Sequence, residues 1–307
     1  MGICVWVGGG LPRVSWARGS VVGWNSMPSG SLLALCKRYI AERAVNLEPA
    51  ARTVRAVWKV EYGLGWRYAL RPTVQDAPVL REFILLQVNG FGSSHQETTG
   101  LSRLRLDCIG LDAFHLERFP LAYQIAALDA VASVFVPPPT REIRLAGSNT
   151  EKLIARTDVI VEEVLAHANR INRRRPRIVI VGALESLITR LVRERRFQVQ
   201  ASDADTTVVG RSYSGVIVES AQDTIRLIRG SDVAVVTGMV LATDTADEIL
   251  EAARKGGARL VLFMQTGANL VEPCLAAGAH AVVCEPYPFY FMPGESIVSV
   301  YRASEGQ

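Results

Sequence analysis

Beyond residue 176, short apolar β-branched runs alternate with amphipathic segments, and this alternation constrains the fold more than any other feature. The expected strands are 177–181, 197–201, 233–236, 259–263 and 281–284, and the expected helices are 184–192, 221–228, 244–255 and 270–277. Strands that recur about every 25 residues with helices between them predict a parallel, doubly wound sheet covered on both faces. In such sheets, ligands bind beyond the carboxyl ends of the strands, near the point where strand order reverses.

The first half of the chain has a different order of elements. A pair of strands is expected at 54–62 and 66–70, joined by the turn Gly63-Leu64-Gly65, with a third strand at 82–88. Pro120 begins an amphipathic helix that the run of prolines from 137 to 139 ends. Strands followed by helices predict a small α+β domain.

The division into domains follows from this change of pattern. We expect an α+β domain over 27–147, a linking helix over 148–175 capped by Ser148 or Asn149, and a Rossmann-like domain over 176–307. Residues 1–26 hold three of the five Trp residues and no acidic residue. They are expected to be a disordered or mis-assigned extension, with Met27 nearer the natural start.

Composition limits the partners. The most apolar stretch, 121–136, carries Gln124 and Asp129 and is shorter than the roughly 20 residues that cross a bilayer, so no membrane span is expected. The arginines at 173–175 lack interleaved aromatic residues, which favours a solvated linker over a nucleic-acid contact. Five cysteines without a Cys-x-x-Cys pair fit a reducing cytoplasm. A homodimer is left open.

Several segments resemble a known family. The sequences "RIVIVGALESL", "SDVAVVTGMVLATDTADEIL" and "ARLVLFMQTGANLVEPCLAAGAHAVVCEP", with "RFPLAYQIAALDAVASVF" before them, are similar to the putative heavy-metal chelation family over about residues 52–303. The resemblance implies an enolase N-terminal-like domain followed by a Rossmann-like domain, with the active site in the cleft between them. One departure concerns the first loop, where the family usually has extra residues with Phe-Pro after the glycine. Here Gly182 leads directly into Ala183-Leu184-Glu185, which leaves open what this loop binds.

Gly182 and Asp203 form the first candidate pair. Gly182, followed by Glu185, opens a helix where backbone N–H groups can hold an anion. Asp203 lies 21 residues beyond Gly182, the position of a ribose-binding acid. Because only one of the three glycines of G-x-G-x-x-G is present, ordinary strand-end polarity is favoured over nucleotide binding.

Two later loops are the stronger candidates for ligand binding, because small and polar residues follow neighbouring strands in both. Their residues are Thr237, Gly238, Met239 and Thr243 in one loop, and Gln265, Thr266, Gly267 and Ala268 in the other. We expect Thr237, Gly238, Thr243 and residues 265–267 to line one crevice with a charged residue of the first domain. Glu61, Arg67 and His95 are the candidates there, with His95 in a polar loop at 92–100.

A metal site is not expected. Cys274, His280 and Cys284 have a spacing that suits a transition metal, but buried free cysteines usually act as small hydrophobic residues. The sequence also shows no nucleophile elbow, phosphate-binding Walker loop or paired-carboxylate motif, so it predicts no mechanism.

Three functions remain as hypotheses. The first is binding of a small anionic or metal-chelating molecule in the interdomain cleft, with enzyme activity left open. The second is a biosynthetic enzyme that uses S-adenosylmethionine or NAD(P) on the Rossmann-like domain. The cofactor is left open among S-adenosylmethionine, a nucleotide and a chelated metal ion. The third is a non-catalytic interaction module.

Overall fold

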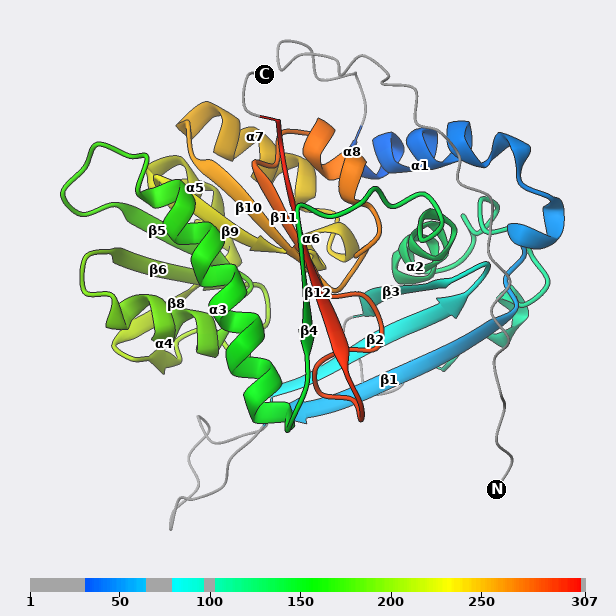
Figure 1. Cartoon of the computed structure of the whole chain (residues 1–307), viewed down its shortest axis with the longest axis horizontal. Helices are drawn as coiled ribbons and strands as arrows, with labels where there is room; N and C mark the ends of the chain where they lie inside the picture. The colour runs from blue at the N-terminus through cyan, green and yellow to red at the C-terminus, as the bar shows by residue number, and fades with distance from the viewer. Residues whose placement is uncertain (1–30, 65–78, 97–102, 305–307) are drawn as a thin grey trace.

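Two sheets of very different size organise the molecule (Figure 1). The computed structural model describes residues 31–64, 79–96 and 103–304. The expectations for residues 1–26, for the strand at 66–70 and for Arg67 lie outside the described residues.

The small sheet is antiparallel and has the order β1-β2-β3. Its strands are β1 (Ala56–Leu64), β2 (Val79–Gln87) and β3 (Phe91–Gln96). The turn predicted at Gly63-Leu64-Gly65 is wrong in part, because Gly63 and Leu64 continue β1 and pair with residues of β2.

The polar loop predicted at 92–100 is also wrong for its described part, since 92–96 belong to β3. Helix α2 (Leu121–Ala132) packs on this strand and leaves no room for a side chain at position 92: a Cβ on Gly92 would lie 2.1 Å from the backbone nitrogen of Ala130. Close packing against α2 therefore accounts for the glycine at position 92.

The large sheet has the order β4-β12-β11-β10-β9-β5-β6-β8-β7. Its strands are β4 (Arg141–Leu145), β5 (Arg177–Val181), β6 (Gln198–Asp203), β7 (Ser212–Tyr213), β8 (Val216–Ser220), β9 (Val233–Thr237), β10 (Arg259–Met264), β11 (Ala281–Cys284) and β12 (Ser296–Arg302). Six strands from β11 to β8 are parallel, and β12, β4 and β7 pair antiparallel. The α/β fold class with a doubly wound sheet is confirmed.

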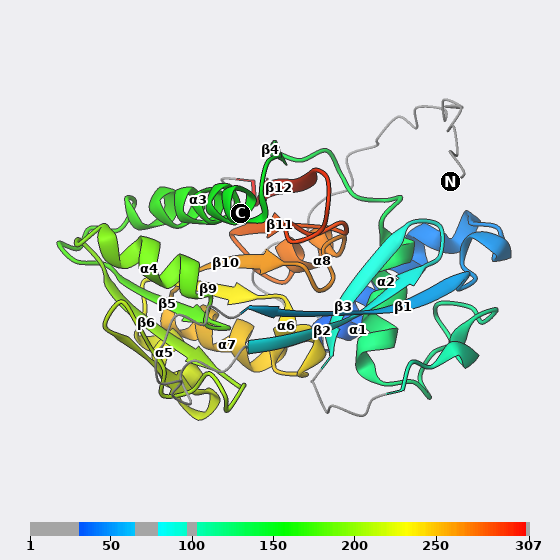
Figure 2. The same cartoon turned by 90° about the horizontal axis from the view of Figure 1, so that it is seen from below.

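Helices cover both faces of the large sheet. The described helices are α1 (Leu32–Arg43), α2, α3 (Asn149–Ala168), α4 (Glu185–Arg193), α5 (Thr224–Gly230), α6 (Met239–Ala242), α7 (Ala246–Gly256) and α8 (Val271–Ala276), with 3-10 turns at Ala44–Asn46, Pro49–Ala51, Leu106–Cys108 and Ala221–Asp223. Figure 2 shows α3 and α4 on one side of the sheet and α5 and α7 on the other. Alternate residues of each central strand therefore enter two separate hydrophobic clusters, which explains the unbroken apolar runs.

The long helix α3 begins as the sequence predicts. Ser148 and Glu151 form a reciprocal capping box, in which each side chain accepts a hydrogen bond from the other residue's backbone N–H. Helix α3 links the first unit, built around the small sheet, to the second unit, built around the large sheet. It also lies across the large sheet and contacts β9, β10 and β12. The domain boundaries stay predictions with one correction: β4 precedes residue 147 but is hydrogen-bonded to β12 in the large sheet.

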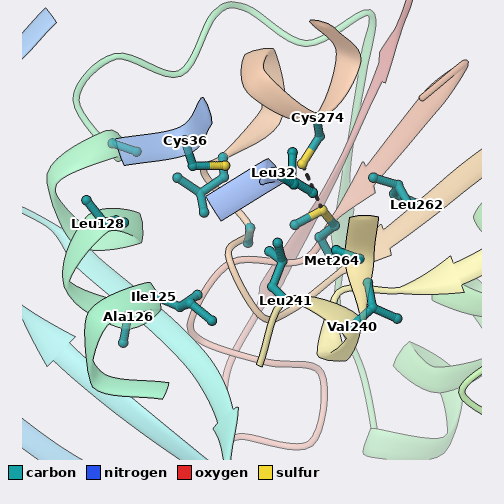
Figure 3. Close-up of a cluster of buried hydrophobic side chains, with 14 of the residues drawn as sticks. Leu32, Cys36, Ile125, Ala126, Leu128, Val240, Leu241, Leu262, Met264 and Cys274 are labelled. Atoms are coloured by element: carbon teal, nitrogen blue, oxygen red, sulfur yellow. Dashed lines mark hydrogen bonds between the residues drawn. The ribbon is translucent and has the colours of Figure 1, made fainter. Parts of the chain in front are cut away.

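The two units share one hydrophobic core. Side chains of α1 and α2, such as Cys36 and Ile125, belong to the same buried cluster as Leu241 of α6 and Met264 of β10 (Figure 3). The sulfur of Cys274 on α8 lies 3.8 Å from the Met264 sulfur in this cluster. The small sheet is thus held against the large one through α1 and α2. No helix among the described residues has the length and apolar character to cross a membrane.

Candidate functional site

Strand order in the large sheet reverses between β5 and β9. From β5 the chain builds outward through β6 and β8, and it then returns to place β9, β10 and β11 on the other side of β5. A pocket of ≈ 100 Å³ opens at the carboxyl ends of these strands. Gly182 follows β5, Asp203 ends β6 and Thr237 ends β9, and all three line the pocket. We call it the switch-point pocket, because this is where doubly wound sheets bind their ligands.

The lining combines apolar walls with oxygen atoms. Its residues are Val181, Gly182, Asp203, Ala204, Ala221, Thr224, Ile225, Thr237, Met239, Val240, Thr243, Thr245, Glu248 and Ile249. Two carboxylates and four threonine hydroxyls supply the side-chain polarity. None of these described lining residues is Lys, Arg or His. The pocket therefore presents two acidic side chains and four hydroxyls, which can accept or donate hydrogen bonds, without a basic side chain among these residues.

Asp203 is buried and its carboxylate is oriented by the backbone. Oδ2 accepts the N–H of Ala183 at 2.8 Å, and Oδ1 accepts the N–H of Asp205 at 2.9 Å. A carboxylate has about four lone-pair positions, so two remain after these bonds. Asp203 is thus a fixed acceptor that can still take two hydrogen bonds from a ligand.

Gly182 allows β5 and β9 to form the floor of the pocket. Its φ of +83° is in the left-handed region, and a Cβ there would lie 2.3 Å from Oγ1 of Thr237. The glycine therefore serves close packing against Thr237. A glycine-rich anion loop is not needed to explain it.

The structure brings together five of the predicted ligand-binding residues at this pocket: Gly182, Asp203, Thr237, Met239 and Thr243. Glu185 is exposed on the first turn of α4 and is outside the lining. Gly238 caps α6 and packs on the next loop, since a Cβ there would lie 2.5 Å from the carbonyl oxygen of Thr266.

The second predicted loop, 265–268, contacts β3 instead. The Ser93 hydroxyl donates to the carbonyl oxygen of Gln265 at 2.6 Å, and the Gly267 N–H donates to the Ser93 carbonyl at 2.9 Å. Oγ1 of Thr266 accepts the backbone N–H of His95 at 2.8 Å, while Ala268 is buried in the core. The loop thus joins the two sheets, and a ligand-binding role for it stays a prediction.

The two described candidates of the first unit, His95 and Glu61, do not line the switch-point pocket. His95 is buried on β3, with its ring edge against Phe83. Burial, with the positive charge of Arg81, lowers the pKa of His95 to about 4, so its imidazole is neutral near pH 7. Glu61 is exposed on β1 and pairs with Lys59. None of these contacts involves the described lining residues.

Sequence reasoning missed Thr224, Ile225, Glu248 and Ile249 as lining residues. The first two follow β8, a strand that was not predicted, and the other two lie in the first half of α7. Glu248 and Ile249 could have been found from the sequence. The helix that contains them starts one residue after Thr245, so its first turns must flank the loop that follows β9.

Cys274 and Cys284 are buried core residues, and His280 is half-buried. Burial raises the pKa of Cys274 to about 12, and Nδ1 of His280 accepts the N–H of Leu260. Among the residues the structure describes, no three His, Cys, Asp or Glu side chains form a group that could hold a metal ion.

A buried carboxylate fixes the second loop to α2. Asp129 accepts the backbone N–H groups of Ser93 at 2.8 Å and Asn269 at 2.7 Å. Burial outweighs these bonds and raises the pKa of Asp129 from 3.8 to about 7. The neutral form is therefore favoured in the folded protein relative to the unfolded chain.

This raised pKa predicts a pH-dependent stability. Between about pH 4 and pH 7 the unfolded chain has lost the Asp129 proton that the folded protein retains, so the free energy of unfolding falls as pH rises, by about 4 kcal/mol in total. Urea unfolding of the wild type and of Asp129→Asn at several pH values isolates this contribution as the difference between the two profiles. A difference that stays constant across this range would contradict the assignment.

This architecture was compared with protein families and with solved structures. A family model described as putative heavy-metal chelation matches residues 166–263. A protein of unknown function from the DUF364 family of Pyrococcus horikoshii is 15% identical, with 89% of this chain and 100% of that chain covered and a TM-score of 0.53. A DUF364 protein from Desulfitobacterium hafniense is 11% identical, with 86% and 98% covered and a TM-score of 0.48.

The chain is therefore a two-sheet α/β protein with a Rossmann-like sheet. Its resemblance to the putative heavy-metal chelation family is confirmed, with the family model matching within the large-sheet unit. At 15% identity, the Pyrococcus horikoshii structure supports the fold alone. No curated protein matches the chain.

Proposed function

We propose that this protein binds a small molecule whose hydroxyl-bearing moiety occupies the switch-point pocket. The observation that carries the proposal is the oriented Asp203 carboxylate, which lines a pocket at the point where strand order reverses. The pocket has a volume of ≈ 100 Å³, and one water needs about 10–15 Å³ on this measure. The pocket therefore has room for several waters, or for a group the size of a sugar ring. The rest of the ligand would extend beyond the pocket.

The heavy-metal name of the family is not supported by this lining. Its polar side chains offer carboxylate and hydroxyl oxygens, which suit hard cations better than soft heavy metals. A metal-chelating molecule in the cleft between the two units therefore stays a separate hypothesis. S-adenosylmethionine and NAD(P) both carry ribose hydroxyls, so both are candidate ligands. Dimer formation and a cytoplasmic location also stay predictions.

Calorimetric titration of Asp203→Asn tests the proposal. The ligand panel contains adenosine, S-adenosylmethionine, NAD, and zinc and nickel ions, and each is titrated into the wild type and the variant. We expect the ligand that binds the wild type to bind Asp203→Asn at least about tenfold more weakly, since an amide cannot supply two acceptor oxygens.

The matched control is Asp158→Asn, which changes the same group at an exposed ion pair with Arg190 outside the pocket. Thr237→Val is a second, nearly isosteric pocket variant, and melting temperatures without ligand show that each variant folds. Equal affinity of the wild type and Asp203→Asn for every bound ligand would contradict the proposal.

A further inference from the structure

We infer that the switch-point pocket selects a phosphate-free nucleoside, with a neutral or cationic group at the 5′ position, over nucleotides and dinucleotides. This inference rests on the proposed function and specifies the class of its ligand. Three features of the described residues lead to it.

The first feature is the backbone amide at the entrance to α4. Dinucleotide-binding sheets use the N–H groups of this turn and the helix N-terminus to hold a pyrophosphate. Here the Ala183 N–H donates to Oδ2 of Asp203 at 2.8 Å. The protein's own carboxylate thus occupies a position at which a phosphate oxygen would otherwise be bound.

The second feature is the sign of the charge. Asp203 and Glu248 are acidic, and no basic side chain is present among the described residues that line the pocket. Basic groups nearby are already paired: Arg81 contacts Asp205 at 2.6 Å, and Arg226 contacts Glu219 at 2.6 Å and Asp223 at 3.0 Å. A phosphate would therefore meet like charge without a lining cation to offset it.

The third feature is the pattern of acceptors and apolar walls. The two remaining acceptor positions of Asp203 match the two donors of a ribose diol. Ile225, Val240 and Ile249 supply apolar surface to the same pocket. Apolar walls around a few fixed polar groups are typical of small-molecule sites, and here they suit a nucleoside.

Paired titrations test the inference. Adenosine is compared with adenosine 5′-monophosphate, S-adenosylmethionine with NAD, and methyl β-D-ribofuranoside with ribose 5-phosphate, so that the last pair is independent of the base. Within each pair we expect the phosphate-containing member to bind the wild type at least about tenfold more weakly.

Reversing one charge at the pocket should increase its affinity for a phosphate-containing ligand. Glu248 is exposed on α7, so Glu248→Lys should fold, and it should raise the affinity for adenosine 5′-monophosphate relative to adenosine by about tenfold. Glu117→Lys makes the same change of charge at an exposed residue outside the lining and should leave this ratio unchanged.

The outcomes separate the two proposals. If the phosphate-containing members bind as tightly as their partners and this binding is lost in Asp203→Asn, the inference about ligand class is wrong while the proposed function stands. If no probe shows binding that depends on Asp203, the proposed function fails and the inference fails with it. An unchanged affinity ratio in Glu248→Lys would also count against charge selection.

Discussion

We expect replacement of Glu285 by alanine to lower the free energy of unfolding by about 3–5 kcal/mol, because it leaves the buried Arg156 guanidinium without its partner. Glu285 is fully buried and Arg156 is 4% exposed, with 3.3 Å between Nη1 and Oε2. Glu285 also accepts hydrogen bonds from the Gln265 side chain and the Tyr290 backbone. The guanidinium lies over the Tyr290 ring, 4.1 Å from its centroid. This ion pair therefore connects α3, the end of β10 and the segment after β11.

Urea unfolding of Glu285→Ala measures the loss. The matched control is Glu162→Ala, which breaks the exposed ion pair with Arg141 and should cost less than about 1 kcal/mol. A double variant, Arg156→Leu with Glu285→Ala, should regain part of the loss because it removes the unpaired charge. Equal losses for Glu285→Ala and Glu162→Ala would contradict the importance of the buried pair.

Gly92→Ala is the second substitution with a large expected effect, about 3 kcal/mol or more of destabilisation. A Cβ on Gly92 would lie 2.1 Å from the Ala130 nitrogen and 2.2 Å from the Ala126 carbonyl oxygen. Both atoms are backbone of α2, so the strand and helix must separate, and overpacking of this kind is costly. Differential scanning calorimetry measures the change.

Gly230→Ala is the control, because at the end of α5 an added Cβ meets no atom closer than 3.9 Å. We expect this control to be neutral or slightly stabilising, since alanine restricts the unfolded chain. Similar melting temperatures for Gly92→Ala and the wild type would show that α2 and β3 are less closely packed than the structure indicates.

The large sheet was predictable because its strands carry a strong local signal. The apolar runs at 177–181 and 233–236 are confirmed as β5 and β9, with β9 one residue longer. Four strands, β4, β7, β8 and β12, escaped prediction, although β8 and β12 contain apolar β-branched residues. β4 and β12 pair antiparallel with each other at one edge of the sheet although they are far apart in sequence, and local patterns do not predict such a pairing. The polar residues at 92–96 predicted a loop, but they form β3, where packing against α2 requires the glycine at position 92.

The candidate site was predictable in part for the same reason. Gly182, Asp203 and Thr237 end three parallel strands, so general rules for α/β sheets bring them to one edge. Those rules do not predict where the first unit, built around the small sheet, lies relative to the large sheet. The backbone carbonyl of Ser93 accepts the Gly267 N–H, and the backbone N–H of His95 donates to the Thr266 hydroxyl. These bonds join β3 to the 265–268 loop, and no local sequence pattern predicts them.

The central claim is that ligand binds in the switch-point pocket, and backbone amide NMR of the full chain tests it most directly. On titration with adenosine, we expect concentration-dependent shifts of the amide signals of Gly182, Ala183 and Thr237, and we expect these shifts to be lost in Asp203→Asn. Shifts confined to Ser93, His95 and the 265–268 loop would place the ligand between the two units instead. That result would contradict the switch-point assignment.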